Sequence, residues 1–584
     1  MRRKTKIVCT LGPASDDIET LSSMVDAGLD VARLNFSHGN HEEHKERIEN
    51  IKNIAREKGK PVGLMLDTKG PEVRTGDLRK DEVELENGKK VIMTTEEIEG
   101  DSNRFSVQYK GLPDDLQEGS QILIDDGLIE LKVEEIDGSE IHCTIINGGV
   151  LGSRKGVNLP GVKVELPALT EKDRKDILFG IEQDVHFIAA SFVRKAEDVI
   201  EIRKLLEENG AEDIQIIPKI ENQEGVDNID EIIEVADGIM VARGDLGVEI
   251  QAEKIPVIQK NLIKKCNEVA KPVITATQML DSMIRNPRPT RAEASDVANA
   301  IFDGTDATML SGESAAGDFP VESVKTMANI AEEAELSLSY KEAFKKEYPK
   351  PKTVTGAISL ASCETAADLD TEAIITATGS GLTSRMVSKY KPMNPIIAVT
   401  PNERVQHFLT LSWGVYPLLV PQSDSTDEMI NNAINIALEN NLVQNGDLVT
   451  ITAGAPVGIP GTTNLIKVDV VGKPVIEGQG VGKRNVTGQV KLVKTAKEAD
   501  EKIEEGDILV TRMTDKNFVP AMKRAAAVIT AKGGLTSHPA IVGLNLGIPV
   551  VVSAGEVFEL LANDETVTVD GIRGLVYRGR AHIK

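Results

Sequence analysis

Short apolar runs alternate with stretches of helical spacing over most of the first 340 residues. The apolar runs predict strands at residues 4–10, 29–35, 61–67, 185–192, 214–220, 238–242, 272–278 and 307–311. The stretches between them repeat apolar residues every three or four positions and predict helices at 16–27, 42–58, 171–182, 196–208, 222–236, 252–270, 291–301 and 321–336. Ser15 or Asp16 is expected to cap the first helix. Eight successive strand–helix units predict a (β/α)8 barrel, or TIM barrel, in the α/β class.

The alternation stops between residues 72 and 167, where short strands and turns follow each other without a helical pattern. Asn87-Gly88 and Asp137-Gly138 are hairpin signals in this stretch. We therefore expect an inserted all-β domain at 72–167. It divides the barrel into a first part, 1–71, and a second part, 168–345.

A charged linker at 340–352 leads to two further predicted domains. The first, at 346–473, is expected to be a doubly wound α/β domain that binds an effector, with strands at 373–378, 395–399, 414–419 and 447–452. The second, at 474–584, has its own strand and turn pattern and is expected to be an extra small α/β domain.

Polar residues gather directly after the predicted barrel strands. The clusters lie at 33–37, 67–69, 219–221, 243–245, 275–278 and 311–314. The carboxyl ends of the strands hold the active sites of such barrels, and random placement would scatter polar clusters over both ends. This end of the barrel is therefore the expected site.

The stretch 214–249 reads strand, helix, strand, and it places Glu221 and Asp245 at equivalent ends of two consecutive strands. Parallel neighbours lie about 4.8 Å apart, and two carboxylates at that spacing suit one hard cation such as Mg²⁺. Lys219 stands beside them, so the site offers a metal and a cation to a phosphate or enolate substrate. The competing interpretation is a surface salt-bridge cluster; the coincidence at two strand ends favours the metal site.

The loop 378–384 joins a predicted strand to a helix start and is rich in glycine and hydroxyl side chains. Backbone N–H groups at such a place form a phosphate site, and a plain glycine-rich turn is the alternative. The candidate effector-phosphate residues are Thr378, Ser380, Thr383 and Ser384. A second Gly/Pro-rich loop, 453–464, is placed to close over them.

Composition limits the class of protein further. The 584 residues carry a formal net charge of −25, which argues against a nucleic-acid partner or an anionic membrane surface. The four cysteines form no C-x-x-C pair, as expected for a reducing cytoplasmic location. The basic amino terminus is not followed by a long apolar segment, so we expect no signal peptide and no transmembrane helix.

The motifs in order resemble the pyruvate kinase family. They are VARLNFSHG (31–39), LDTKGPEVRTG (66–76), KGVNLPG (155–161), KIENQEG (219–225), VARGDLGVEI (241–250), TATQMLDSM (275–283), PRPTRAE (287–293) and MLSGESAAG (309–317). The last segment, with His538, resembles the phosphohistidine domain of phosphoenolpyruvate-utilising enzymes. Two positions depart from these patterns: Ser314 stands where the family commonly has Thr, and Pro539 follows His538 where a small residue is usual. The second departure argues against phosphorylation of His538.

The resemblance implies transfer of the phosphoryl group of phosphoenolpyruvate to ADP, giving ATP and pyruvate in the last step of glycolysis. It implies Mg²⁺ (or Mn²⁺) and K⁺ as cofactors. The catalytic residues would be Lys219, Arg33, Thr277 and Ser311, and the substrate would be bound by Arg33, Lys219, Gly244, Asp245 and Thr277. Mg²⁺ would be held by Glu221 and Asp245, and K⁺ by Asn35, Ser37, Asp67 and Thr68. The nucleotide would be bound by Asn35, His38, Arg74 and Lys155, under the inserted domain as a lid.

The resemblance also implies a homotetramer and allosteric regulation by a phosphorylated effector, either a sugar phosphate or a nucleoside monophosphate. Two other functions stay open from the residues alone. One is a metal-dependent aldolase or lyase that uses the same carboxylate pair on an enolate. The other is a phosphometabolite sensor whose barrel is inert.

Overall fold

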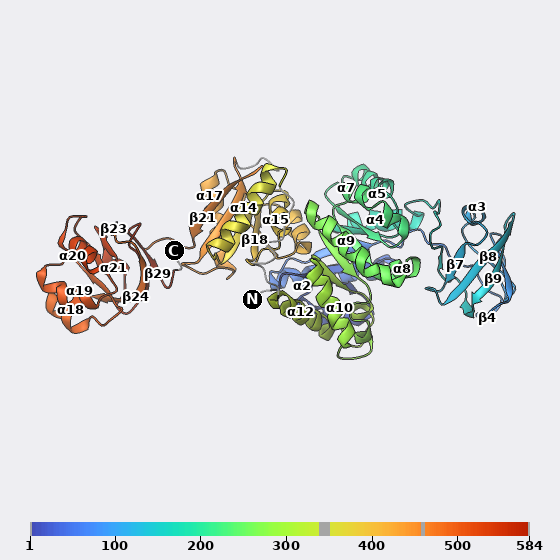
Figure 1. Cartoon of the computed structure of the whole chain (residues 1–584), viewed down its shortest axis with the longest axis horizontal. Coiled ribbons are helices and arrows are strands. Elements are labelled where there is room, and N and C mark those ends of the chain that lie inside the picture. The colour runs from blue at the N-terminus through green and yellow to red at the C-terminus, as the bar shows by residue number, and fades with distance from the viewer. Residues whose placement is uncertain (1–2, 338–350, 457–461, 582–584) are drawn as a thin grey trace. The chain divides into compact units, whose positions relative to one another are not determined.

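The computed structural model describes residues 3–337, 351–456 and 462–581 (Figure 1). They form two compact units. One comprises the described residues of Met1–Pro349 with Ser388–Lys391 and Glu403–Val415; the other comprises those of Lys350–Val387, Pro392–Asn402 and Tyr416–Lys584. The predicted linker at 340–352 and the predicted border at 345/346 fall largely or wholly outside the described residues, and the domain boundaries stay predictions.

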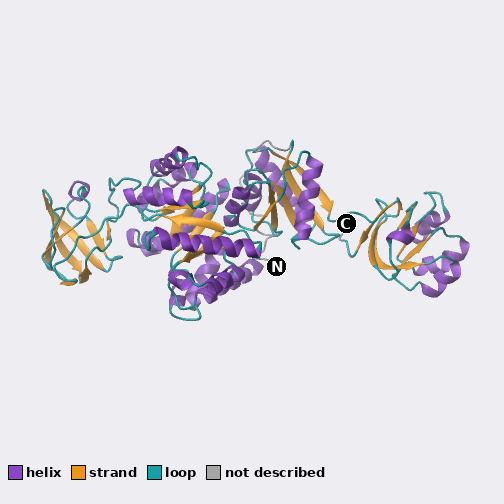
Figure 2. Ribbon diagram, turned by 180° about the vertical axis from the view of Figure 1, so that it is seen from behind, coloured by secondary structure: helices purple, strands orange, loops and turns teal. Residues whose placement is uncertain are grey.

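The first unit contains a closed barrel of eight parallel strands, in the order β1-β16-β15-β14-β13-β12-β3-β2. Its strands are β1 (Lys6–Leu11), β2 (Val31–Asn35), β3 (Gly63–Asp67), β12 (Phe187–Ala190), β13 (Gln215–Ile220), β14 (Ile239–Ala242), β15 (Val273–Ala276) and β16 (Ala307–Leu310). The predicted barrel is therefore confirmed, strand for strand. The strands are almost entirely buried because helices cover their outer side (Figure 2), which is why each reads as a continuous apolar run.

The covering helices follow the predicted pattern, with three local differences. They are α1 (Ile18–Ala27), α2 (His41–Lys58), α4 (Glu171–Glu182), α5 (Ala196–Glu208), α9 (Ile255–Val269), α10 (Arg291–Asp303) and α12 (Pro320–Ser337). The predicted helix at 222–236 is interrupted at Asn228 into α6 (Gln223–Asp227) and α7 (Ile229–Val235). The cap of α1 is Asp17, which accepts from the Thr20 N–H at 2.8 Å, so the predicted caps Ser15 and Asp16 are wrong.

The third difference is helix α8 (Arg243–Glu249), which follows β14 without an intervening loop. The sequence does not predict this helix because its two glycines, Gly244 and Gly247, are poor helix formers. This helix carries Asp245.

The inserted segment is built of strands in two sheets. A six-stranded sheet has the order β11-β7-β8-β9-β5-β6, and β10 pairs with β4. The strands are β4 (Glu82–Leu85), β5 (Lys90–Thr94), β6 (Arg104–Ser106), β7 (Gln121–Ile124), β8 (Ile129–Asp137), β9 (Glu140–Asn147), β10 (Gly149–Gly152) and β11 (Val157–Asn158). Asp137-Gly138 joins the paired strands β8 and β9 as predicted. Asn87-Gly88 does not make a hairpin, because β4 and β5 pair with other strands, and the single helical turn α3 (Leu112–Asp115) was not foreseen.

The second unit contains two more sheets. The five-stranded sheet has the order β19-β18-β17-β20-β21, with β17 (Ala373–Ala377) parallel to β18 (Ile396–Thr400) and β20 (Leu448–Gly454). Strand β19 is Val415–Leu419, and β21 (Thr463–Val470) runs antiparallel to β20. Helices α14 (Val354–Asp368), α15 (Leu382–Ser388) and α17 (Thr426–Glu439) complete this α/β fold.

The remaining sheet has eight strands in the order β22-β29-β28-β24-β25-β26-β27-β23. They are β22 (Ile476–Glu477), β23 (Gln479–Val481), β24 (Asn485–Leu492), β25 (Ile508–Thr511), β26 (Ala527–Thr530), β27 (Val550–Val552), β28 (Thr566–Asp570) and β29 (Leu575–Arg578). The helices that accompany it are α18 (Ala496–Lys502), α19 (Val519–Arg524), α20 (His538–Leu546) and α21 (Val557–Leu560). None of the helices described anywhere in the chain combines the length and apolar composition needed to cross a bilayer.

Candidate active site

A cavity of about 460 Å³ lies at the carboxyl ends of the barrel strands. Several of the predicted site residues line it: Arg33, Asn35, Ser37, His38, Arg74, Lys219, Glu221 and Asp245. They come from three barrel strands, β2, β13 and β14, or the loops and helix that follow them, and from the start of the inserted segment. These predicted site residues therefore do cluster at the carboxyl end of the barrel.

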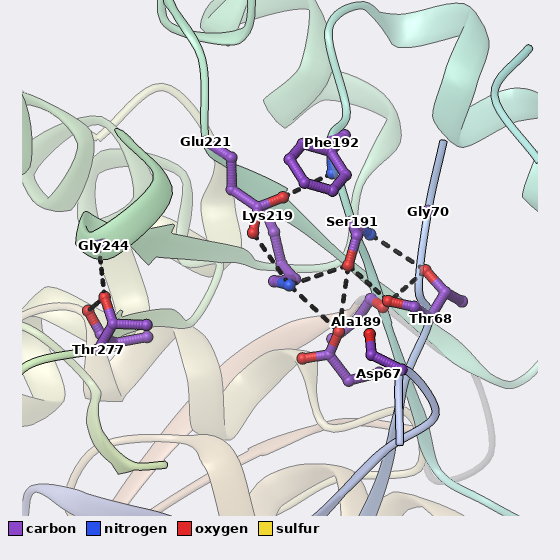
Figure 3. Close-up of polar contacts among 12 residues, drawn as sticks. Asp67, Thr68, Gly70, Ala189, Ser191, Phe192, Lys219, Glu221, Gly244 and Thr277 are labelled. Atoms are coloured by element: carbon purple, nitrogen blue, oxygen red, sulfur yellow. Dashed lines mark hydrogen bonds and ion pairs between the residues drawn. The ribbon is translucent and has the colours of Figure 1, made fainter. Parts of the chain in front are cut away.

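Lys219 is the centre of the polar network (Figure 3). It lies on β13, and its Nζ lies 3.0 Å from Glu221 Oε1, 3.2 Å from Asp67 Oδ1 and 2.9 Å from Ser191 Oγ. Burial alone would lower the pKa of Lys219, but the carboxylates of Asp67 and Glu221 outweigh it and hold the pKa above its ordinary value. The side chain is therefore a fixed ammonium.

Asp67 joins Lys219 to a second cation. Its carboxylate is fully buried, and Oδ2 accepts from Arg33 Nε at 2.5 Å. Arg33 also donates through Nη1 to Thr10 Oγ1 at 2.8 Å. Burial opposes ionisation of Asp67, but Arg33 and Lys219 keep the pKa of its carboxyl below the usual range. One buried carboxylate thus positions two cations that line the same cavity.

Glu221 and Asp245, the two predicted metal ligands, both line this cavity. Glu221 is 1% exposed, and its Oε2 accepts from the Phe192 N–H at 2.6 Å. Burial raises the pKa of Glu221 to about 7, and Asp245 adds to the rise while Lys219 opposes it. A cation between the two carboxylates would relieve this cost, so their chemistry fits a divalent metal.

Two protein carboxylates are too few for an all-protein metal cage. In the described part of the chain no group of three or more His, Cys, Asp or Glu side chains is arranged to hold a metal ion. Mg²⁺ is commonly held by one or two carboxylates with substrate oxygens and water completing its shell. The pair therefore suits a metal that arrives with an anionic substrate.

Gly244 and Thr277 lie beside Asp245, at the start of α8 and just after β15. The Gly244 N–H donates to Thr277 Oγ1 at 2.7 Å, and the Thr277 hydroxyl donates to the Ala276 carbonyl at 2.6 Å. Thr277 has a φ of 65°, in the left-handed region that a β-branched residue rarely adopts. Such strain persists where the surroundings enforce it and is frequent at functional sites.

The four predicted K⁺ ligands lie at adjacent strand ends, because Asn35 on β2 pairs in register with Asp67 on β3. Asn35 and Ser37 line the cavity, and Asn35 Oδ1 accepts from the Ser37 N–H at 3.1 Å. Thr68 is 2% exposed, and its Oγ1 accepts from the Ser191 N–H at 3.1 Å. The set offers oxygen donors and one negative charge, which suits a hard monovalent cation.

Two of the four predicted nucleotide residues, Arg74 and Lys155, lie where the inserted segment leaves and rejoins the barrel. An isolated antiparallel β-bridge joins Arg74 to Gly156, the residue after Lys155, and so holds the two junctions together. Arg74 Nε pairs with Glu72 Oε2 at 2.5 Å, and Lys155 Nζ pairs with Asp125 Oδ1 at 3.0 Å. Both cations line a second cavity of about 370 Å³ that also reaches Asp245. His38 is exposed at the rim of the first cavity.

Ser311 follows β16, and its backbone N–H donates to Glu313 Oε2 at 2.7 Å. Its Oγ is buried and makes no hydrogen bond within the described residues. Ser311 does not line the cavity that holds Lys219. Of the predicted catalytic residues, Arg33 and Lys219 line this cavity, Thr277 contacts Gly244 next to Asp245, and Ser311 is not brought into this cluster.

The predicted effector loop does join a strand, β17, to a helix, α15. Two of its four candidate hydroxyls are already bonded: Ser384 Oγ to Thr376 Oγ1 and Thr383 Oγ1 to Thr463 Oγ1, both at 2.7 Å. Thr378 is 8% exposed, whereas Ser380 is exposed. The second loop, 453–464, lies partly outside the described residues.

His538 begins helix α20, and its Nδ1 lies 2.8 Å from Thr514 Oγ1. Pro539, directly after it, is buried.

Three residues that the sequence analysis did not single out belong to the site. Ser191 Oγ contacts Lys219, Asp67 and the Thr68 carbonyl, and Phe192 supplies its N–H to Glu221. Arg154 lines the cavity from the inserted segment. A signal for the first two existed, because they follow the fourth barrel strand directly, as the chosen residues follow theirs.

Comparison with known proteins agrees with this architecture. Family profiles match the chain in order: "Pyruvate kinase, barrel domain" at residues 2–324, "Pyruvate kinase, alpha/beta domain" at 356–469 and "PEP-utilising enzyme, mobile domain" at 503–574. Curated pyruvate kinases from Geobacillus stearothermophilus and Bacillus licheniformis are each 56% identical to the chain, with 100% of both sequences covered. A crystal structure of a pyruvate kinase from Cryptosporidium parvum matches with a TM-score of 0.77 at 43% identity, covering 80% of this chain and 96% of that one.

The protein is a phosphotransferase, as its barrel, the polar residues at the carboxyl ends of the barrel strands and these relatives together indicate. Within this class the chain belongs to the pyruvate kinase family, which confirms the resemblance found in its motifs.

Proposed function

We propose that this chain transfers the phosphoryl group of phosphoenolpyruvate to ADP, giving ATP and pyruvate in the last step of glycolysis. The bond between phosphorus and the enol oxygen breaks, and a bond from phosphorus to a terminal ADP oxygen forms. The enolate that is left takes a proton at its methylene carbon. The observation that carries the proposal is the buried ammonium of Lys219, fixed beside two carboxylates at a cavity of substrate size.

Lys219 and Arg33 supply positive charge where the reaction develops negative charge. Asp67 holds both cations before substrate arrives, so little reorganisation is needed during transfer. Phosphoryl transfer depends mainly on such positioning and charge neutralisation. Lys219 would face the transferring phosphoryl group and the enolate oxygen, and Arg33 would grip the phosphoryl oxygens.

Glu221 and Asp245 would hold Mg²⁺ (or Mn²⁺), which supplies charge neutralisation and orientation to the substrate oxygens when bound. The Gly244 N–H and the Thr277 hydroxyl would bind the substrate carboxylate. The carboxylate would replace Thr277 Oγ1 as the acceptor of the Gly244 N–H, and the Thr277 hydroxyl would turn its proton from the Ala276 carbonyl to the substrate. Thr277 would pass the proton that converts the enolate to pyruvate, and Ser311, which does not line the cavity that holds Lys219, is left out of this step.

Asn35, Ser37, Asp67 and Thr68 would bind K⁺ through oxygen atoms. Asn35, His38, Arg74 and Lys155 would bind ADP, with Arg74 and Lys155 at its phosphates. The inserted domain would then cover the nucleotide and exclude water, so that the phosphoryl group reaches ADP. Contacts of Asn158 and the Leu159 N–H with Glu249 Oε1, at 3.1 and 3.3 Å, tie the inserted segment to α8 and support this arrangement.

The proposal also includes a cytoplasmic homotetramer regulated by a phosphorylated effector at the 378–384 loop. Because Thr383 and Ser384 are bonded internally, the phosphate would be received chiefly by Ser380 and nearby backbone N–H groups. Ser380→Asp should abolish activation by a sugar phosphate or nucleoside monophosphate and leave the unactivated kcat near the wild-type value. Unchanged activation would place the effector elsewhere.

A coupled assay for pyruvate, run with and without ADP, tests the reaction. Pyruvate formation that requires ADP supports the proposal. An aldolase or lyase would not need ADP, and a phosphometabolite sensor would form no pyruvate. The carboxylate pair and the lid cations Arg74 and Lys155 favour the kinase over both.

A further inference from the structure

A third cavity, lined by basic residues and separate from the two described above, lies at the opposite end of the barrel from Lys219. It has a volume of about 520 Å³, within the usual range of about 300–1,000 Å³ for small-molecule sites. Its walls come from α2, from the segments that lead into β3 and β12, and from helix α16 (Glu403–Phe408). Val62 and His186, which precede these two strands, lie in its wall, whereas Asp67 and Ser191 lie at the far ends of the same strands.

The cavity carries an excess of positive charge in a chain whose net charge is −25. Its charged lining consists of four cations and two carboxylates: Lys52, Arg56, Lys60, Arg404, Asp184 and Glu403. Arg404 pairs with Asp184 at 3.0 Å and with Asp213 at 2.6 Å. The other three cations have no carboxylate within ion-pair distance among the residues that the structure describes.

These three cations are held in place by neutral groups. Lys52 Nζ donates to the Gln183 carbonyl at 2.8 Å, Lys60 Nζ to the Val25 carbonyl at 3.0 Å, and Arg56 Nη1 to Asn53 Oδ1 at 3.3 Å. Burial lowers the pKa of Lys52 and of Lys60, so each ammonium is costly as the structure stands. An anion in the cavity would remove that cost.

A stacked pair of histidines forms the inner wall. The rings of His186 and His407 lie 4.2 Å apart and 10° from parallel. His186 Nδ1 accepts from the Leu64 N–H at 2.9 Å, which keeps His186 neutral, whereas His407 Nδ1 lies 3.0 Å from the Val62 carbonyl and donates to it. His407 can therefore take up a proton at Nε2, and a bound anion would favour that protonation.

We propose that this cavity is a binding site for a small phosphate monoester or free phosphate, distinct from both the active site and the 378–384 loop. The three cations without carboxylate partners match the charge and the several acceptor oxygens of a phosphoryl group. The cavity is larger than a lone phosphate requires, and the flat histidine wall leaves room for an organic part. The site therefore favours the monoester.

The experiment follows the His407 ring by NMR in the full chain labelled with 13C at histidine Cε1. The resonance is assigned with His407→Gln, and the probes are inorganic phosphate and glycerol 3-phosphate, each added up to about 10 mM, which would saturate a Kd of about 1 mM. Each probe should raise the pKa of His407 in a saturable way. A tighter response to glycerol 3-phosphate would identify a monoester site, and equal responses would identify a site for free phosphate.

The variant Lys52→Gln/Arg56→Gln removes two of the cations from the exposed side of α2, and Lys45→Gln/Lys58→Gln is its matched control on the same helix outside the cavity. The first pair should weaken the His407 response at least tenfold, while the control pair should leave it unchanged. Unchanged kcat verifies folding of both. A His407 resonance that neither probe moves, or that responds equally in both variants, would overturn the proposal.

Discussion

Lys219 Nζ and Asp67 Oδ1 lie 3.2 Å apart, although 152 residues separate them and their strands are not neighbours. Strand β12 lies between β13 and β3, and Ser191, directly after β12, bonds both groups with its hydroxyl. Three consecutive barrel strands thus converge on one ammonium. The predictions for the active site follow from this arrangement.

Lys219→Met should reduce kcat roughly 100- to 1000-fold, or about 3–4 kcal/mol, the usual cost of losing one charge-stabilising contact in a closed site. The KM for phosphoenolpyruvate should rise much less, because the charge matters most in the transition state. Steady-state kinetics measure both, with Lys265→Met at an exposed ion pair as the control. A variant that mainly raised KM would make Lys219 a binding residue.

Ser191→Ala should lower kcat about tenfold, because Lys219 and Asp67 lose the hydroxyl that fixes their separation. Ser191→Thr keeps a hydroxyl and should restore most of the activity. A purely structural serine would instead show a reduced melting temperature in Ser191→Ala with kcat unchanged.

Asp245→Ala should raise the Mg²⁺ concentration needed for half-maximal activity and cut turnover by orders of magnitude, since half of the protein's carboxylate charge on the ion would be lost. Titration of activity with Mg²⁺ checks this, and Asp230→Ala on the exposed face of α7 is the control. If Asp245→Ala showed the same dependence on Mg²⁺ as the wild type, Asp245 would not be a ligand of the metal.

The buried His186 should make the stability depend on pH. Burial and the neighbouring His407 hold the pKa of His186 well below its ordinary value of 6.5. The unfolded chain therefore binds more protons below pH 6.5, so the free energy of unfolding should be highest above that pH and fall as the pH decreases, by up to about 1.4 kcal/mol per pH unit from this group. His186→Gln should flatten this slope in urea unfolding at pH 5–7, whereas His142→Gln, partly exposed in the inserted segment, should not.

The barrel could be predicted from the sequence because each of its strands is buried on both sides and therefore forms a continuous apolar run. A stretch with helical spacing follows each run, which completes the pattern. Glu221 and Lys219 could be predicted for the same reason, because they lie at the end of a predicted strand. Ser191 and Phe192 gave only the weaker signal of their place at a strand end, because a serine and a backbone N–H carry no charge that marks them before the strands are closed into a barrel. Helix α8 was hidden by Gly244 and Gly247, and the failed hairpin at Asn87-Gly88 shows that a turn does not decide which strands pair.

The most direct measurement is the amount of ATP and pyruvate formed from phosphoenolpyruvate by the purified full chain with Mg²⁺ and K⁺, with and without ADP, beside Lys219→Met. We expect equal amounts of the two products, only when ADP is present, and at least a 100-fold lower rate in the variant. Pyruvate without ATP, or a variant as fast as the wild type, would contradict it.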